Sequence, residues 1–199
     1  MPIELEVKLK VAELSPVRAR LRELGAERVG QFLETNIFFD TEDRTLLAGD
    51  QGLRLRINRN VEDGRQDYTL THKGPRQHGS MKNREETEVG VTEPDSAIEL
   101  VGRLGYGQTL SFEKRRETWK LEGCKVELDE LPFLGEYVEI EGPREEIIRQ
   151  VQQKLGLGDC PMVKASYVAL LNTHLQEQGE WGRMVQFPVS TIPAPEPGR

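Results

Sequence analysis

The chain has 199 residues, of which 36% are hydrophobic and 31% are charged, and its formal net charge is −7. A chain of this length forms one domain or two small ones, and its apolar content is too high for a disordered protein. The negative charge argues against a general nucleic-acid-binding protein. The two cysteines lie in no C-x-x-C motif, which argues against a disulfide framework or a zinc ribbon. No apolar run is long enough to cross a membrane and the charged N-terminus is unlike a signal peptide, so we expect a cytoplasmic protein.

Helix signals occur at four places along the chain. The first three segments each carry a proline at the start and a glycine at the end, which are typical helix boundaries. They cover residues 15–25, 94–105 and 143–156. The fourth segment, residues 164–179, carries an apolar stripe at helical spacing.

Segments in which apolar and polar residues alternate predict strands between these helices. They cover residues 3–10, 36–41, 52–58, 67–74, 82–91, 109–121, 124–131 and 135–142. Most are joined by short polar turns. The chain shows no regular alternation of strand and helix, which a parallel sheet would need, so the sheet should be largely antiparallel. The last ten residues are rich in proline and predict an extended tail.

The polar faces of these predicted strands are charged almost throughout. Residues 3–10 read IELEVKLK, in which two acids and then two bases alternate with apolar residues. A half-exposed antiparallel strand normally has a polar outer face, which explains any single segment. The pattern recurs in seven strands, and four helices with apolar stripes need an apolar sheet surface to cover. In a closed barrel the helices would lie on the outer face, and the charged faces would line the lumen.

A lumen that holds charges of both signs is unfavourable unless a ligand bridges them. Arginine and lysine bind phosphate oxygens, and arginine does so with two parallel hydrogen bonds. Carboxylates bind hard divalent cations such as Mg²⁺ or Mn²⁺. A polyphosphate that carries its metal ion would satisfy both sets of side chains.

These segments resemble a known family. ELEVK is similar to the E-x-E-x-K signature of the CYTH, or triphosphate tunnel metalloenzyme, superfamily, which includes class IV adenylyl cyclases, thiamine triphosphatases and inorganic tripolyphosphatases. The resemblance continues through GLRLR, LTHKGP, NREETEV, FEKRRETW and YVEIEG, covers roughly residues 2–171, and looks closest to the bacterial class IV cyclase branch. It implies an α+β fold: an eight-stranded antiparallel β-barrel, or tunnel, with a charged lumen and flanking helices. This domain would cover residues 1–175, and residues 176–199 would form a polar, proline-rich C-terminal tail.

The resemblance also implies roles for individual residues. The metal ligands for Mg²⁺ or Mn²⁺ would be Glu4, Glu6, Glu139 and Glu141. The phosphate-binding residues would be Lys8, Arg54, Arg56, Lys73, Arg84, Lys114 and Arg116. The residues implied in catalysis are Lys8, Lys114, Arg116 and Asp129. Further residues of the tunnel would be Glu86, Glu88 and Lys164.

Two reactions fit such a site. In an adenylyl cyclase the ribose 3′-hydroxyl attacks the α-phosphorus of ATP and pyrophosphate leaves, whereas in a hydrolase water attacks the terminal phosphorus of tripolyphosphate or thiamine triphosphate. The resemblance favours the cyclase, and a non-catalytic polyphosphate- or nucleotide-binding module is a third alternative. We expect the partner to be a triphosphate-bearing small molecule such as ATP, tripolyphosphate or thiamine triphosphate, rather than nucleic acid or a membrane. A homodimer stays open.

Overall fold

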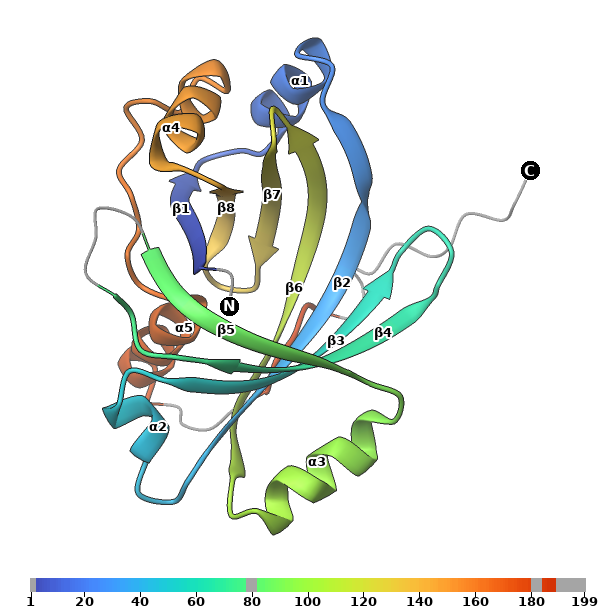
Figure 1. Ribbon diagram of the computed structural model, residues 1–199, viewed down its shortest axis with the longest axis vertical. Helices are drawn as coiled ribbons and strands as arrows, with labels where there is room; N and C mark the ends of the chain where they lie inside the picture. The colour runs from blue at the N-terminus through green and yellow to red at the C-terminus, as the bar shows by residue number, and fades with distance from the viewer. Residues whose placement is uncertain (1–2, 78–81, 180–183, 189–199) are drawn as a thin grey trace.

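A computed structural model describes residues 3–77, 82–179 and 184–188 of the chain (Figure 1). Eight strands form a closed antiparallel barrel in the order β2-β3-β4-β5-β1-β8-β7-β6, and the pairing of β2 with β6 closes it. The strands are β1 (Ile3–Val11), β2 (Glu27–Asp40), β3 (Gly52–Asn60), β4 (Gln66–Lys73), β5 (Lys82–Val91), β6 (Gly107–Leu121), β7 (Cys124–Leu131) and β8 (Gly135–Gly142). The predicted antiparallel barrel with flanking helices is confirmed.

Five helices surround the barrel. They are α1 (Ser15–Glu23), α2 (Thr45–Ala48), α3 (Pro94–Arg103), α4 (Glu145–Lys154) and α5 (Tyr167–Glu177). The four predicted helices are confirmed, and Gly25 and Gly156 follow α1 and α4 with φ values of 69° and 75°, the left-handed conformation that glycine adopts readily. Helix α2 was not predicted because four residues are too few to show a period. It is held by Asp40, whose carboxylate accepts hydrogen bonds from the backbone N–H groups of Leu46 (2.9 Å) and Leu47 (3.0 Å).

Strand β2 is longer than the sequence predicts. It begins at Glu27, whereas the predicted strand begins at residue 36. Its pairing with β6 shifts register between Arg28 and Gly30, as at a β-bulge, and this irregularity interrupts the alternation by which strands are recognised. The first part of β2, before residue 36, therefore shows no alternation from which a strand could be predicted.

Two helix-covered cores lie on the outside of the barrel. Helices α1 and α4 cover the outer face of β1, β7 and β8, where Leu21 and Ile148 share a core with Val126 (Figure 1). Helix α3 covers another part of the wall, where Val101 shares a core with Leu55 of β3. The apolar strand faces are therefore turned outward to the helices, as expected.

A third core lies at one end of the lumen. Leu171 of α5 shares this core with Phe112 of β6 and Tyr137 of β8. Phe112 lies on the same face of β6 as Lys114 and Arg116, because residues two apart on a strand point to the same side. Helix α5 therefore closes the end of the lumen at which the charged faces give way to apolar residues.

Secondary structure is found beyond residue 175, the predicted end of the domain. Helix α5 ends at Glu177, and the short strand β9 (Met184–Val185) pairs in parallel with β6, where Val185 is buried. Residues 189–199 lie outside the described residues, so the extended tail stays a prediction. Within the described ranges, no helix is long and apolar enough to cross a membrane.

Candidate active site

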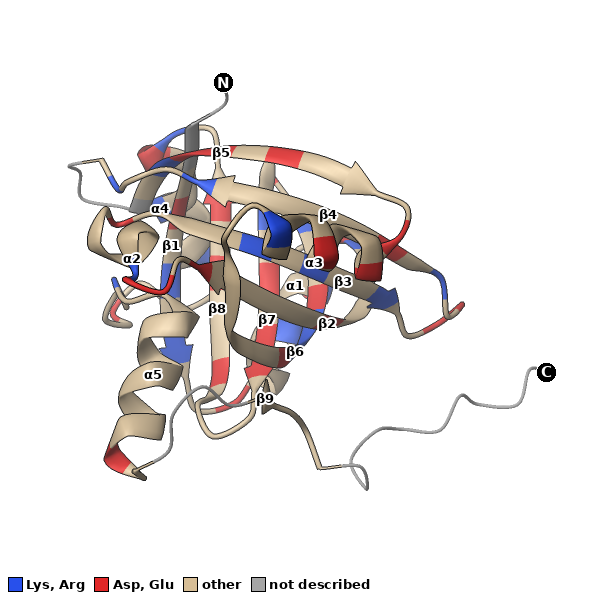
Figure 2. Ribbon diagram, turned by 90° about the horizontal axis from the view of Figure 1, so that it is seen from below, with Lys and Arg blue, Asp and Glu red and all other residues tan. Residues whose placement is uncertain are grey.

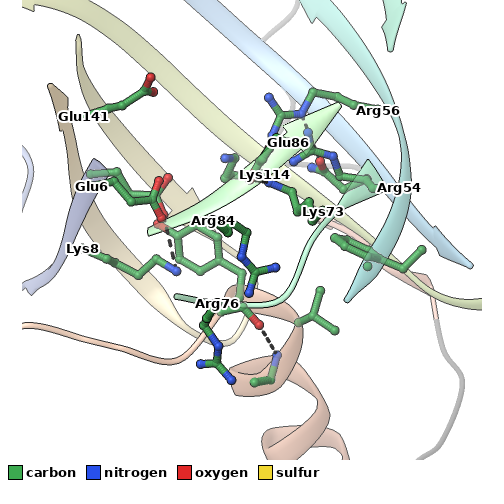
Figure 3. Close-up of a pocket in the computed structure, with 18 of the residues that line it drawn as sticks. Glu6, Lys8, Arg54, Arg56, Lys73, Arg76, Arg84, Glu86, Lys114 and Glu141 are labelled. Atoms are coloured by element: carbon green, nitrogen blue, oxygen red, sulfur yellow. Dashed lines mark hydrogen bonds and ion pairs between the residues drawn. The ribbon is translucent and has the colours of Figure 1, made fainter. Parts of the chain in front are cut away.

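A cavity of about 300 Å³ lies in the barrel lumen, and each of the eight barrel strands contributes to its lining (Figure 3). Of the residues singled out from the sequence, those that line it are Glu6, Lys8, Arg54, Arg56, Lys73, Arg84, Glu86, Glu88, Lys114, Arg116, Glu139, Glu141 and Lys164. Basic side chains outnumber acidic ones in this lining, although the whole chain has a net charge of −7. The structure thus brings most of the predicted residues to one anion-attracting cavity, while their individual roles stay predictions.

Strand register places opposite charges next to each other in the wall. Glu139 of β8 lies opposite Lys8 of β1, and Asp129 of β7 lies opposite Arg116 of β6. Residues in register on neighbouring strands point to the same face, so these pairs share the lumen side. Figure 2 shows that acidic and basic residues recur along the barrel strands. The alternation in the sequence is therefore the direct cause of the charged lumen.

Arg116 is the centre of a buried ionic network. Its guanidinium contacts Asp129 (2.7 and 2.6 Å), Glu127 (2.6 Å), Glu139 (2.6 Å) and, more distantly, Glu34 (3.7 Å). Burial alone would lower the pKa of Arg116, but these carboxylates raise the pKa well above its usual value. Arg116 therefore holds β2, β6, β7 and β8 together, and a contact with phosphate stays a prediction.

Glu34 is a site residue that the sequence analysis missed. Its carboxylate lies 3.1 Å from Lys114 Nζ and 3.3 Å from Arg56 Nε, and the residue is 2% exposed. Burial favours the neutral acid, but the surrounding cations, Arg56 first, hold the pKa of Glu34 well below its usual range. Glu34 shares a strand face with Asn36, so a strand begun at residue 27 would have revealed it.

Lys8 is held at the junction of β1 and α5. Its Nζ atom lies 3.4 Å from Glu139, donates a hydrogen bond to the carbonyl oxygen of Ala165 (3.1 Å) and lies 3.7 Å from the ring centre of Tyr167. The Tyr167 hydroxyl donates to Asp129 (2.9 Å). Burial and the Asp129 carboxylate raise the pKa of Tyr167 well above its usual value, so the hydroxyl keeps its proton.

Asp129 is on the lumen side of β7 but is covered by the side chains that contact it. It is completely buried and does not line the cavity, although it was predicted as a catalytic residue. Its oxygens contact Arg116, Lys114 (3.3 Å) and the Tyr167 hydroxyl. In this position it orients three side chains, and its predicted part in catalysis would have to act through them.

Arg54 offers an unsatisfied donor to the cavity. One terminal nitrogen, Nη2, lies 3.0 Å from Thr71 Oγ1 and 3.4 Å from Glu88, whereas the buried Nε–H has no hydrogen-bond partner within the described part of the chain. Burial, and then repulsion from Arg56, lower the pKa of Arg54 to about 10, so the guanidinium stays charged at neutral pH. A buried unpaired donor is unfavourable, and a phosphate oxygen would satisfy it.

Replacing Arg54 by glutamine should weaken the binding of tripolyphosphate by roughly ten- to a hundredfold. The reason is the loss of a charge-assisted hydrogen bond, which contributes about 1.5–3 kcal/mol. Isothermal titration calorimetry measures the effect. The matched control is Arg59→Gln, which removes the same charge from an exposed position on the same strand. Equal affinities for the two variants would contradict the placement of phosphate at Arg54.

Three carboxylates face the cavity from the adjacent strands β1 and β8. Glu6 lies opposite Glu141 in the register of these strands, and Glu139 lies one lumen-facing position along β8. Glu139 contacts Arg116 and Lys8, and Glu141 contacts Lys125 (2.5 Å). The side chain of Glu4, the fourth predicted ligand, lies outside the part that the structure describes.

These carboxylates fit a divalent cation that binds together with phosphate. Over the described ranges, no group of three or more His, Cys, Asp and Glu side chains is arranged to hold a metal ion by itself. Mg²⁺ usually takes one or two carboxylates and completes its coordination with water and substrate phosphate oxygens. The carboxylate oxygens of Glu6, Glu139 and Glu141 match this mode of binding, in which the protein supplies only part of the coordination.

One side of the cavity is apolar. The rings of Phe38 and Phe112 stack with centroids 5.8 Å apart and an interplanar angle of 11°. Val168 of α5 and Leu47 of α2 also line the cavity, and Leu47 is 64% exposed. These residues offer a surface for an uncharged ring next to the charged lumen.

Comparisons with known proteins agree with this geometry. The family model described as CYTH domain matches residues 2–156. The adenylate cyclase CyaB of Aeromonas hydrophila is 27% identical over 187 residues, which are 89% of this chain and 93% of the relative. A protein of Methanocaldococcus jannaschii, named as a candidate adenylate cyclase, is 27% identical over 177 residues, which are 84% of this chain and 98% of the relative. A solved structure from Pyrococcus horikoshii is similar with a TM-score of 0.75 and 28% identity, over 86% of this chain and 99% of that one.

Proposed function

Because the chain belongs to the CYTH domain family, we propose that it is a metal-dependent enzyme that acts on triphosphates and that its reaction converts ATP to cyclic AMP and pyrophosphate. The observation that carries the proposal is a barrel lumen in which basic side chains outnumber acidic ones, in a chain of negative net charge. Such a lumen has to be matched by a strongly anionic ligand, and a triphosphate has both the charge and the linear shape. We also propose a cytoplasmic location, where ATP is available.

Three carboxylates of β1 and β8 lie across the cavity from two arginines of β3, although Lys8 lies beside the carboxylates. Glu6, Glu139 and Glu141 would hold Mg²⁺ or Mn²⁺, which supplies charge neutralisation and an activated oxygen nucleophile when bound. Arg54 and Arg56, on the opposite strand β3, would bind phosphate oxygens (Figure 3). This division lets one linear ligand contact both sets of residues at once.

Two features favour ATP over inorganic tripolyphosphate. The apolar residues Phe38, Phe112, Leu47 and Val168 give a purine ring a surface that tripolyphosphate cannot use. Of two relatives that match most of the chain at 27% identity, one is named as an adenylate cyclase and the other as a candidate adenylate cyclase.

The position of the substrate along the lumen decides which reaction occurs. A shift by one phosphate unit, about 3 Å, would change which phosphorus is attacked, and misplacement on this scale changes reactivity.

Hydrolysis of tripolyphosphate or thiamine triphosphate is the second candidate. It is favoured by the dominance of charged residues in the lining, which bind the phosphate chain whatever group is attached to it. A single experiment separates the candidates: the protein is incubated with Mg²⁺ or Mn²⁺ and with ATP, tripolyphosphate or thiamine triphosphate, and the products are identified. Cyclic AMP and pyrophosphate from ATP are expected. Orthophosphate without cyclic AMP would establish a hydrolase, and tight binding without turnover would establish a binding module.

Tripolyphosphate with Mg²⁺ should raise the melting temperature, whereas adenosine should have little effect. Binding of the phosphate chain relieves repulsion among the basic residues of the lumen, and a ligand present at 100 times its Kd stabilises the fold by about 2.7 kcal/mol. Differential scanning fluorimetry measures both shifts. An equal shift with adenosine alone would mean that the ligand is bound chiefly by its ring, contrary to the proposal.

A further inference from the structure

Asp50, Arg76 and Arg84 line the cavity together, and Asp50 contacts both arginines. Arg76 Nε lies 3.0 and 2.9 Å from the two carboxylate oxygens of Asp50, Arg76 Nη2 lies 2.8 Å from Oδ1, and the backbone N–H of Arg76 donates to Oδ2 at 3.0 Å. Arg84 Nη2 lies 3.8 Å from Oδ1. The Asp50 carboxylate is thus the anionic partner of both arginines.

Arg84 keeps an unsatisfied donor despite this contact. Its side chain is 11% exposed, and its buried Nε–H has no hydrogen-bond partner among the residues that the structure describes. The single carboxylate of Asp50 therefore makes close contacts with Arg76 and only one longer contact with Arg84. A group with more oxygen atoms, such as phosphate, would satisfy both guanidinium groups.

Arg76 lies nearer to solvent than the inner cations of the lumen. In Figure 3, Arg76 lies on the side of the cavity next to α5, away from Arg54 and Arg56. The Arg76 side chain is 48% exposed, whereas that of Lys114 is 3% exposed. Arg84, whose side chain is 11% exposed, lies between Arg76 and the inner cations in Figure 3, so the two arginines connect the buried part of the cavity to its solvent-facing rim.

We propose that Arg76 and Arg84 form an outer anion subsite that receives the end of a linear phosphate chain, and that Asp50 occupies this subsite until the ligand displaces it. This inference rests on the proposed triphosphate function. Asp50 is then a specificity-determining residue, because a phosphate chain too short to reach the subsite leaves the Asp50–Arg76 pair in place.

The energetics permit this exchange. A half-exposed ion pair such as Asp50–Arg76 contributes little to stability because water screens it, so a ligand can displace it easily. A phosphate group carries more charge than a carboxylate and offers more acceptor oxygens, so it binds two arginines more strongly. The remaining repulsion between a bound phosphate and the displaced Asp50 carboxylate lowers the affinity for every ligand that enters the subsite.

The test compares pyrophosphate, tripolyphosphate and tetrapolyphosphate by isothermal titration calorimetry, in EDTA so that no metal-dependent turnover occurs. Asp50→Asn removes the competing charge, and asparagine tolerates the left-handed backbone of this position, where φ is 52°. The affinity for tripolyphosphate and tetrapolyphosphate should rise about tenfold, and that for pyrophosphate less than twofold. Adding Arg76→Gln to Asp50→Asn should remove this gain.

The control is Asp43→Asn, which removes an equal charge from an exposed position outside the cavity. The subsite is refuted if Asp50→Asn has the same effect as Asp43→Asn. It is also refuted if Asp50→Asn lowers both the melting temperature and the affinity for all three ligands, as a purely structural role for the Asp50–Arg76 pair would require. The unaltered protein tests the proposed function separately. If it does not bind tripolyphosphate, the triphosphate function fails and the subsite with it, whereas normal binding with an unresponsive Asp50→Asn removes the subsite alone.

Discussion

Replacing Glu6 by glutamine should reduce turnover about a hundredfold or more while the barrel still folds. Glu6 faces the cavity from β1 and lies opposite Glu141, so it belongs to the carboxylates that would bind the divalent cation. Glutamine keeps the shape of the side chain but loses the charge that a hard cation requires. A hundredfold loss corresponds to about 3 kcal/mol of transition-state stabilisation. Steady-state kinetics across a range of Mg²⁺ and Mn²⁺ concentrations measures both the rate and the metal requirement.

The matched control for this change is Glu13→Gln, which alters an exposed carboxylate just beyond the end of β1. It should leave turnover and metal requirement unchanged. Near-normal activity of the Glu6→Gln protein, with the same dependence on metal, would show that the cation binds elsewhere. Activity of the unaltered protein in excess chelator would refute a metal requirement altogether.

Replacing Arg116 by methionine should cost the fold about 3–5 kcal/mol. The change leaves Asp129, Glu127 and Glu139 buried without their shared partner, and an uncompensated buried charge is far more unfavourable than the absence of an ion pair. Methionine fills a similar volume, so packing contributes little to the loss. The midpoint of urea unfolding, followed by circular dichroism, measures it.

Lys120→Met is the control on the same strand, because Lys120 is 62% exposed and lies 3.7 Å from the exposed Glu27. Its effect should stay below about 1 kcal/mol. Lower pH should partly restore the Arg116→Met protein, since protonation removes the charge of the unpaired carboxylates. If Arg116→Met lowers the free energy of unfolding no more than Lys120→Met does, the buried acids are neutral or solvated. Arg116 would then not be the centre of a buried ionic network.

The barrel and its charged face could be predicted because the side-chain period of a strand is fixed at two residues. Once Arg54 and Arg56 are placed on one face of β3, their direction follows from Leu55, which lies between them on the apolar face. This logic also placed Glu6 and Arg54 in the lumen before their distances were known. It fails only where the period itself is disturbed, as at the irregular pairing between Arg28 and Gly30.

Other features of the site depend on partners that are distant in the sequence. Glu34 is a site residue because it lies in register with Lys114, a contact created when the barrel closes. Tyr167 reaches Asp129 only because α5 lies across the end of the lumen. Asp50 contacts Arg76 because α2 and the segment after β4 meet at the rim. None of these contacts leaves a local pattern in the sequence.

The pairing of β1 with β8 also determines when the site can exist during folding. Lys8 and Glu139 are neighbours in the barrel, although they lie near opposite ends of the barrel-forming chain. Forming such a contact requires closing a very long loop, and proteins dominated by distant pairings fold slowly, in milliseconds to seconds. During synthesis on the ribosome, β1 can pair with β8 only after β8 has been synthesised. We therefore expect the carboxylates of β1 and β8 to come together among the last events of folding, so that a partly folded chain has strands but no metal site.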